Sequence, residues 1–268
     1  MSSLEKTLEV EPVQGRQVAI QEKVKSVRPF AVPQRFDVAP GTSSFPHYIF
    51  SPVHYEPTYA YPLVVWLHGS GCDESQLFRI MPKLSLRNYV AVAPRGLSAE
   101  ETKCSRPLRN VRRDGNLCQI SSMYDWPETP DAIAMAEHRI FEAIGRTTER
   151  YKIHNKRIFV VGFDIGGTMA LRLATKYPDH FAGAVSLCGS FPETDIPLRN
   201  WSRIRNFPLM MAVGSQSKVL SQQKVCSQLR LFHAAGLCIS LRQYHTAQEL
   251  TPKMLSDVNR WMMEQIIK

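Results

Sequence analysis

The residues best placed to do chemistry lie between Arg157 and Leu171, where an aspartate stands at the position in which a serine would be expected. An apolar run over residues 158–161 leads into Gly162-Phe163-Asp164-Ile165-Gly166-Gly167 and then into a helix-like stretch. This order of strand, sharp turn and helix is that of the G-x-S-x-G nucleophile elbow, with Asp164 in the serine position. Glycines flank such a turn because larger side chains would clash there. The pattern predicts an enzyme scaffold whose nucleophile has been exchanged.

The elements that must position this turn alternate along the chain. The apolar runs and the apolar residues at helical spacing predict strands over residues 47–52, 61–68, 89–94, 158–161, 183–188, 208–214 and 239–244, and helices over 75–86, 129–151, 167–176, 222–235 and 251–267. Strands that alternate with helices of about ten residues or more imply a mostly parallel sheet with helices on both faces. Residues 95–125 are expected to be irregular. The predicted fold class is therefore α/β.

Length and composition favour one domain. The chain has 268 residues, of which 44% are hydrophobic, and α/β folds of this size often form a single core. We expect residues 1–44 to form an N-terminal arm or edge strands of that domain, and residues 45–268 to form its α/β body. The segment between Cys188 and Phe207 is too short for a large helical cap.

The net charge of +9 does not by itself indicate a nucleic-acid partner, since the basic residues are scattered and no nucleic-acid module is present. The exception is a cluster of arginines at positions 106, 109, 112 and 113, which we interpret mainly as a solvated loop. Arg106 and Arg109, together with Trp126, are retained as candidates for contact with a ligand or partner. Whether the arginine-rich loop binds anions is left open by the sequence.

Several features bear on location and cofactors. The first residues do not resemble a signal peptide, and no apolar run approaches the roughly 18 residues that span a bilayer, so we expect a cytoplasmic protein without membrane insertion. The six cysteines form no C-x-x-C pair and are expected to be reduced thiols. The histidines are dispersed and form no metal-binding motif, so neither a metal nor another cofactor is expected.

With the elbow in place, the chain resembles the α/β-hydrolase superfamily, in particular its small, lidless branch of carboxylesterases, phospholipases and dienelactone hydrolases. Four further segments carry the resemblance: Leu67-His68-Gly69-Ser70-Gly71, Ala93-Pro94-Arg95-Gly96, Tyr124-Asp125-Trp126-Pro127, and the stretch from Tyr244 to Leu255. The resemblance covers about residues 45 to 268. It implies an oxyanion hole formed by backbone amides of Ser70 or Gly71 and of Ile165.

The resemblance also implies a serine nucleophile, a carboxylate and a histidine, in that order along the chain. The serine position holds Asp164, the acid position after the strand ending at Gly214 holds Ser217, and the histidine position before Glu249 holds Gln248. All three members of the triad are therefore expected to be replaced. Asp164 would lie at a helix N-terminus, which favours an anion, and is expected to point at or fill the oxyanion hole.

An alternative chemistry uses the aspartate itself. Haloalkane dehalogenases and epoxide hydrolases share this fold and have a nucleophilic aspartate at the elbow in segments similar to G-x-D-x-G-G. Asp164 fits that position, but the second step needs a histidine base. His245 is the candidate, three residues before the expected place, and Glu193 or Asp195 would have to act as the acid.

The sequence thus supports three hypotheses. The first is a catalytically degraded hydrolase, a pseudoenzyme that keeps its scaffold for binding a small molecule or protein, or for assembly. The second is a hydrolase with Asp164 as nucleophile and His245 as base. The third is an interaction protein that forms a homodimer through an edge strand or its final helix.

Overall fold

The structure is a computed structural model that describes residues 45–102, 124–192 and 201–267, apart from residues 235 and 238. The expected N-terminal arm, residues 1–44, lies outside the described residues. The elements along the chain are β1 (His47–Phe50), β2 (Tyr61–Leu67), η1 (Glu74–Gln76), α1 (Leu77–Leu84), β3 (Val90–Pro94), β4 (Leu97–Ser98), α2 (Ala99–Thr102), β5 (Tyr124–Asp125), α3 (Pro130–Arg150), β6 (Ile153–Phe163), α4 (Ile165–Lys176), η2 (Pro178–His180), β7 (Gly183–Leu187), α5 (Trp201–Ile204), β8 (Leu209–Gly214), α6 (Gln222–Ala234), β9 (Ile239–Tyr244) and α7 (Pro252–Ile267).

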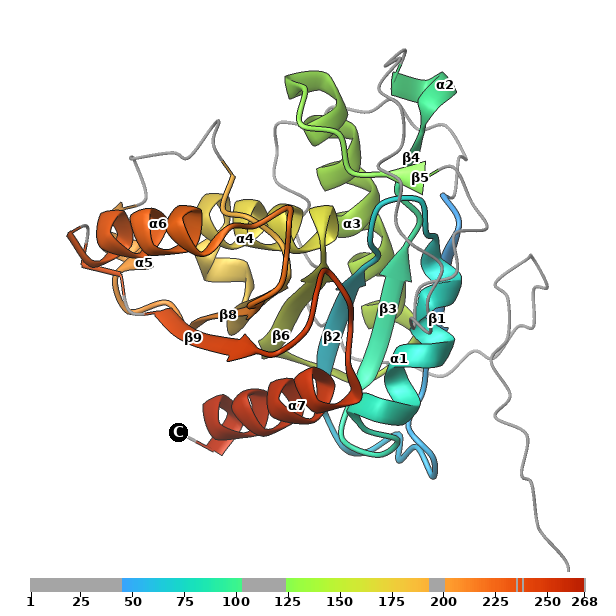
Figure 1. The fold of residues 1–268 in the computed structure, drawn as a ribbon. Coiled ribbons are helices and arrows are strands. Elements are labelled where there is room, and N and C mark those ends of the chain that lie inside the picture. Colours follow the sequence, from blue (N-terminus) through green and yellow to red (C-terminus); the bar gives the residue numbers. More distant parts are fainter. Residues whose placement is uncertain (1–44, 103–123, 193–200, 235, 238, 268) are drawn as a thin grey trace, which may run out of the picture.

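A seven-stranded sheet in the order β1-β3-β2-β6-β7-β8-β9 forms the centre of the molecule (Figure 1). β1 runs antiparallel to β3, and every other neighbouring pair in this sheet is parallel. The predicted α/β class with a mostly parallel sheet is confirmed. Because parallel strands end at the same edge, the loops that follow β6, β8 and β9 are brought to one side of the sheet.

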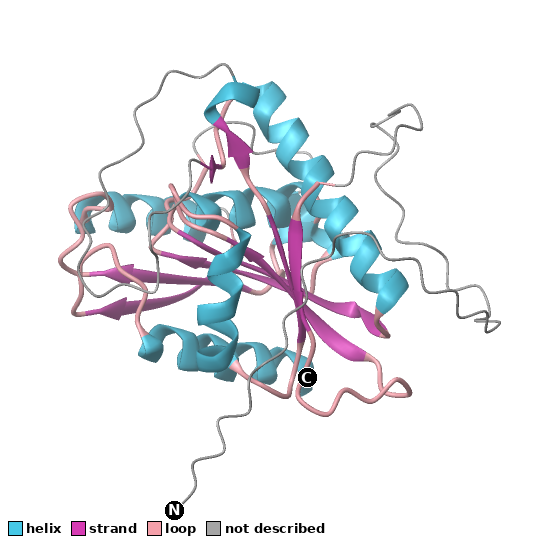
Figure 2. Ribbon diagram, turned by 90° about the vertical axis from the view of Figure 1, so that its right-hand side faces the viewer, coloured by secondary structure: helices cyan, strands magenta, loops and turns pink. Residues whose placement is uncertain are grey.

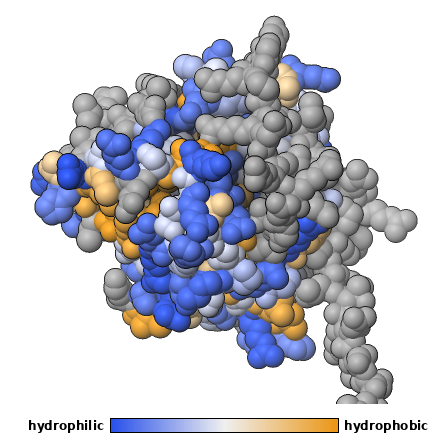
Figure 3. All heavy atoms as spheres, in the orientation of Figure 1, coloured by the Kyte–Doolittle hydropathy of each residue, from blue (hydrophilic) through white to orange (hydrophobic). Residues whose placement is uncertain are grey.

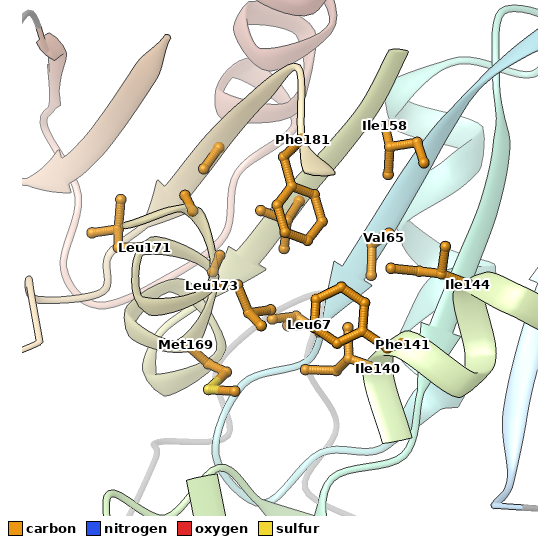
Figure 4. Close-up of a cluster of buried hydrophobic side chains, with 14 of the residues drawn as sticks. Val65, Leu67, Ile140, Phe141, Ile144, Ile158, Met169, Leu171, Leu173 and Phe181 are labelled. Atoms are coloured by element: carbon orange, nitrogen blue, oxygen red, sulfur yellow. The ribbon is translucent and has the colours of Figure 1, made fainter. Parts of the chain in front are cut away.

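The helices cover both faces of the sheet (Figures 1 and 2). β2 is buried along its whole length, and its alternate residues point to opposite faces. Val65 and Leu67 pack with residues of α3 and α4, whereas Val64 and Trp66 pack with residues of α1 and α7. Figure 4 shows the first of these clusters, with Phe141 from α3 beside Leu67. The core therefore consists of two apolar layers separated by the sheet.

The long helix α3 shows how local sequence sets these layers. It begins after Thr129 with Pro130 in its first turn and the acidic Asp131 next to it, both of which suit a helix N-terminus. Its apolar residues at helical spacing, among them Ile140 and Ile144, are buried against the sheet. The helix is thereby fixed on the same face as α4, the helix that follows the elbow.

The largest differences from the prediction concern β6 and residues 95–125. β6 begins at Ile153 rather than at residue 158, because its polar start pairs with Tyr61 before a shift in register against β2. The segment over residues 95–125, expected to be irregular, contains the short helix α2 and the two-stranded sheet β4-β5. Residues 103–123 of that segment lie outside the described residues.

The surface in view is of mixed character. Figure 3 shows hydrophobic residues in small groups between hydrophilic ones on the described part of this face. Among the helices that the structure describes, none combines the length and the apolar character needed to cross a membrane.

Candidate functional site

Asp164 occupies a sharp turn between the end of β6 and the start of α4. Its backbone has φ 52° and ψ −123°, a conformation that residues other than glycine rarely adopt. The turn is fastened on both sides: the Asp164 N–H donates to the carbonyl of Leu187 at 2.8 Å, and the Asp164 carbonyl accepts from the N–H of Gly167 at 2.9 Å. The predicted elbow is therefore present, with an aspartate at its tip.

Two glycines allow this turn because the backbone passes so close to them. A Cβ atom on Gly162 would lie 2.1 Å from the carbonyl oxygen of Gly166, and one on Gly166 would lie 2.4 Å from the carbonyl oxygens of Leu67 and His68. Both distances are far below van der Waals contact. The start of α4 therefore packs directly on the end of β2, and this packing brings the elbow next to the loop that follows His68.

A chain of hydrogen bonds links Asp164, Gln248 and Ser217. The side-chain N–H of Gln248 donates to Asp164 Oδ1 at 2.9 Å, and the Oγ–H of Ser217 donates to Gln248 Oε1 at 2.8 Å. Ser217 follows β8, and Gln248 follows β9. The structure thus brings together the three residues that the sequence singled out, from three separate loops at the same edge of the sheet.

The orientation of the Gln248 amide is set by its partners. Its nitrogen also donates to the carbonyl oxygen of Cys188 at 2.7 Å, so both acceptors lie on the nitrogen side and the one donor lies on the oxygen side. Ser217 Oγ in turn accepts the N–H of Leu220 at 3.1 Å. The role of the Cys188 carbonyl was missed from the sequence, since a main-chain acceptor leaves no signal in residue type.

His245, the alternative base, is not part of this chain. Its Nε2 lies 3.0 Å from the side-chain nitrogen of Gln216, in an exposed position. Among the described residues, the side chain that hydrogen-bonds the Asp164 carboxylate is Gln248. Among the described residues, His245 therefore makes no direct hydrogen bond to the elbow aspartate, and its role as a base stays a prediction. Glu193 and Asp195, the alternative acids, lie outside the described residues.

The three amides expected to form an oxyanion hole differ in their availability. The N–H of Gly71 donates to the carbonyl of Tyr124 at 3.0 Å and is therefore occupied. The backbone N–H groups of Ser70 and Ile165 donate to no residue that the structure describes. Asp164 Oδ1 accepts from Gln248, and the carboxylate makes no hydrogen bond to either amide, so the expectation that Asp164 points at or fills this space stays a prediction.

His68 holds the loop beside the elbow from within the core. Its Nε2 accepts the N–H of Gly96 at 2.9 Å, so the ring proton resides on Nδ1, 2.9 Å from the carbonyl of Gly69. The residue is fully buried, and burial lowers the pKa of the imidazole to about 4. His68 is therefore neutral at pH 7 and acts as a structural link.

Trp126, one of the residues proposed for ligand contact, does not lie at the surface as expected. Trp126 is 1% exposed, and its indole N–H donates to the carbonyl of His68 at 2.9 Å, so its side chain packs inside the protein rather than at a site mouth. The neighbouring Asp125 accepts a hydrogen bond from the hydroxyl of Ser70 at 3.1 Å. Arg106 and Arg109 lie outside the described residues.

The cysteines depart from the expected reduced state at one position. Cys72, in the loop after Ser70, is disulfide-bonded, and its partner is not among the described residues. Cys188 and Cys226 are free thiols. Cys188 is buried, and desolvation raises the pKa of its thiol to about 12, so that it remains protonated and unreactive at pH 7.

No cluster of three or more histidine, cysteine, aspartate or glutamate side chains that could hold a metal ion occurs within the described parts of the chain. The polar groups of the site are those of Asp164, Gln248 and Ser217 together with nearby backbone amides. Such a site offers hydrogen-bond donors and acceptors and one carboxylate.

Known proteins resemble the chain in sequence and in fold. Residues 53–266 match the phospholipase/carboxylesterase family. “Putative esterase NocK” from Nocardia uniformis subsp. tsuyamanensis is 28% identical over 141 residues, which are 52% of this chain but only 36% of that relative, so the match spans about a third of its length.

Solved structures of low sequence identity share the fold. Acyl-protein thioesterase 2 from Zea mays superimposes with a TM-score of 0.61 at 17% identity, over 83% of this chain and 99% of that one. The carboxylesterase of Bacillus cereus gives a TM-score of 0.60 at 16% identity, over 84% and 96% of the two chains. With its elbow, its parallel sheet and the extent of the family match, the chain belongs to the phospholipase/carboxylesterase family of α/β-hydrolases.

Proposed function

We propose that this chain is a non-catalytic member of its family, in which Asp164, Gln248 and Ser217 occupy the nucleophile, base and acid positions of the triad and the scaffold acts in binding or assembly. The observation that carries the proposal is the hydrogen-bond chain from Ser217 through Gln248 to Asp164. It has the connectivity of acid, base and nucleophile, but each residue type has changed.

The exchanged residues cannot perform the chemistry of a serine esterase. A histidine base accepts a proton from the nucleophile and later returns it to the leaving group. The nitrogen of Gln248 already donates to Asp164 and Cys188 and has no lone pair available for a proton. The elbow residue carries a carboxylate, and its attack on an ester would give an anhydride, with no acid among the described site residues to protonate the leaving group.

A hydrolase that uses Asp164 as nucleophile has less support. Its second step needs a base that activates water over the elbow. His245 contacts Gln216 instead, and the neutral amide of Gln248 holds the position next to the carboxylate. The described residues of the site therefore supply this mechanism with a nucleophile but with no base hydrogen-bonded to it.

Fluorophosphonate labelling and hydrolysis of short-chain aryl esters test the proposal. The purified protein should show no turnover above buffer and no phosphonylated serine in the intact mass spectrum. Stoichiometric labelling at any serine would overturn the proposal. Incubation with a haloalkane or an epoxide followed by intact mass measurement serves as a second arm: catalytic release of the alcohol would favour the aspartate mechanism.

A further inference from the structure

The site keeps two unoccupied hydrogen-bond donors. The backbone N–H groups of Ser70 and Ile165 bond no residue that the structure describes. Ile165 begins α4, a helix of 12 residues whose first N–H groups have no partner within the helix. Gly71, the next residue after Ser70, differs because its N–H is bonded to Tyr124. Within the described part of the chain, these two donors are therefore available to a ligand.

The same site holds one unoccupied acceptor. Asp164 is 6% exposed, and its Oδ1 accepts the hydrogen bond from Gln248. Its Oδ2 bonds no residue in the described part of the chain, and it is not among the fully enclosed polar atoms that lack a partner. As far as the described residues go, this carboxylate oxygen lacks a donor, and pairing it would be favourable because the side chain is buried.

The donors and the acceptor are neighbours in space. Ile165 follows Asp164 directly, so its backbone N–H belongs to the same turn as the Asp164 carboxylate. On the other side, the Cβ position of Gly69 would be 3.7 Å from Asp164 Cβ, and the N–H of Ser70 belongs to the peptide that follows Gly69. The loop after β2 is therefore in contact with the elbow, and the N–H groups of Ser70 and Ile165 belong to residues adjacent to the two that make this contact.

We infer that this site binds a primary or secondary carboxamide, with its carbonyl oxygen on the N–H groups of Ser70 and Ile165 and its N–H on Asp164 Oδ2. The inference rests on the proposed non-catalytic function and names the ligand class of that site. An ester has no N–H and would leave the buried carboxylate unpaired, an ionised carboxylic acid would be repelled by Asp164, and an ammonium group has no acceptor for the two amides. The amide would bind intact.

Acetamide, N,N-dimethylacetamide, methyl acetate and acetate form a matched set of probes for NMR titration of the ¹⁵N-labelled protein. Acetamide should shift the backbone resonances of Ser70 and Ile165 saturably and bind about tenfold more tightly than methyl acetate or N,N-dimethylacetamide, the expected effect of one hydrogen bond to a charged group. The resonance of Gly71, whose N–H is occupied, should move less and is the internal control.

Asp164→Asn supplies the decisive variant, because asparagine tolerates positive φ and keeps the shape of the side chain. With Oδ1 still accepting from Gln248, the other atom becomes an NH₂ donor that faces the N–H of acetamide. The preference for acetamide over methyl acetate should therefore disappear. The resonances of residues away from the site should remain those of the folded wild type.

Equal affinity for acetamide and methyl acetate in the wild type, or a saturable shift that spares Ser70 and Ile165, would overturn the inference, as would an absence of binding. These results would leave the non-catalytic proposal standing if ester turnover is also absent. Conversely, fluorophosphonate labelling of the wild type would remove the proposed function whatever acetamide does.

Discussion

The amide of Gln248 donates a 2.9 Å hydrogen bond to the carboxylate of Asp164, across 84 positions of the chain. The same amide accepts the hydroxyl of Ser217. In a serine hydrolase, a relay of this connectivity moves a proton toward and away from the nucleophile. Here the central group is a neutral amide that hydrogen-bonds on both sides, so the contact between Gln248 and Asp164 joins the elbow to the β8 and β9 loops.

Restoring the three residue types together should restore serine-hydrolase chemistry. The variant Asp164→Ser, Ser217→Asp, Gln248→His should be labelled by a fluorophosphonate and hydrolyse an aryl ester about 10²-fold faster than the wild type, the scale of general acid–base catalysis. Each single substitution should remain inactive, because triad residues act as a unit. A folded triple variant that takes no label would refute the assignment of triad positions.

Removing the amide should destabilise the folded protein. Gln248→Leu leaves the Asp164 carboxylate and the Cys188 carbonyl without their partner, and we expect the free energy of unfolding in urea to fall by about 2 kcal/mol. Gln243→Leu is the matched control, since that glutamine is exposed on β9, and it should change stability by less than about 0.5 kcal/mol. Equal stability of the two variants would show that the contact contributes nothing.

Two glycine-to-alanine substitutions should have opposite signs. Gly162→Ala places a Cβ 2.1 Å from the carbonyl oxygen of Gly166, in rigid backbone, and should unfold the protein or destabilise it by several kcal/mol. Gly145→Ala lies in α3 with no atom within 4 Å of the new Cβ and should stabilise the protein by about 0.5–1 kcal/mol. Thermal or urea unfolding of the two variants measures both effects, and a loss of stability in Gly145→Ala would contradict the described packing.

Stability should decrease in mild acid through His68. The pKa of this buried imidazole falls from 6.5 to about 4 on folding, so between these values the unfolded chain binds more protons than the folded one. The contribution is fully present above pH 6.5, is lost as the pH falls toward 4, and amounts to about 3 kcal/mol. His180, whose pKa is also lowered by burial, acts in the same direction.

The His68 ring can be observed directly by NMR, which separates it from other titrating groups. Its ring proton shifts should stay constant down to pH 5 and change only near pH 4. A midpoint close to 6.5 in the folded protein would mean that the hydrogen bond from Gly96 does not hold the neutral form.

The fold followed from the sequence because its elements are local and strongly patterned. The strand at residues 239–244 has the bounds that the sequence predicts, and α3 differs by one residue at each end, since apolar spacing and helix-terminal residues define both. The start of β6 was missed because Ile153, which pairs with Tyr61 of a distant strand, is separated from the apolar run by the polar residues 154–157. Such pairing has no local signature.

The sequence singled out three residues that the structure brings together, and their assignment to triad positions stays a prediction. The positions of Asp164, Ser217 and Gln248 followed from motif order, and the structure joins them through hydrogen bonds. What could not be predicted were the choices between partners: Asp164 Oδ1 accepting from the side chain of Gln248, and Trp126 facing inward. The disulfide at Cys72 was also missed, because pairing between distant cysteines does not follow from their number.

The left-handed backbone of Asp164 has a thermodynamic consequence that does not depend on any reaction. A conformation natural to glycine but imposed on another residue costs about 1–3 kcal/mol, against a typical margin of about 5–15 kcal/mol for a whole domain. The backbone conformation of Asp164 therefore lowers the free energy of unfolding of this chain by a substantial fraction of its usual value. The hydrogen bonds that converge on this residue are what hold the backbone in a shape it would otherwise relax from.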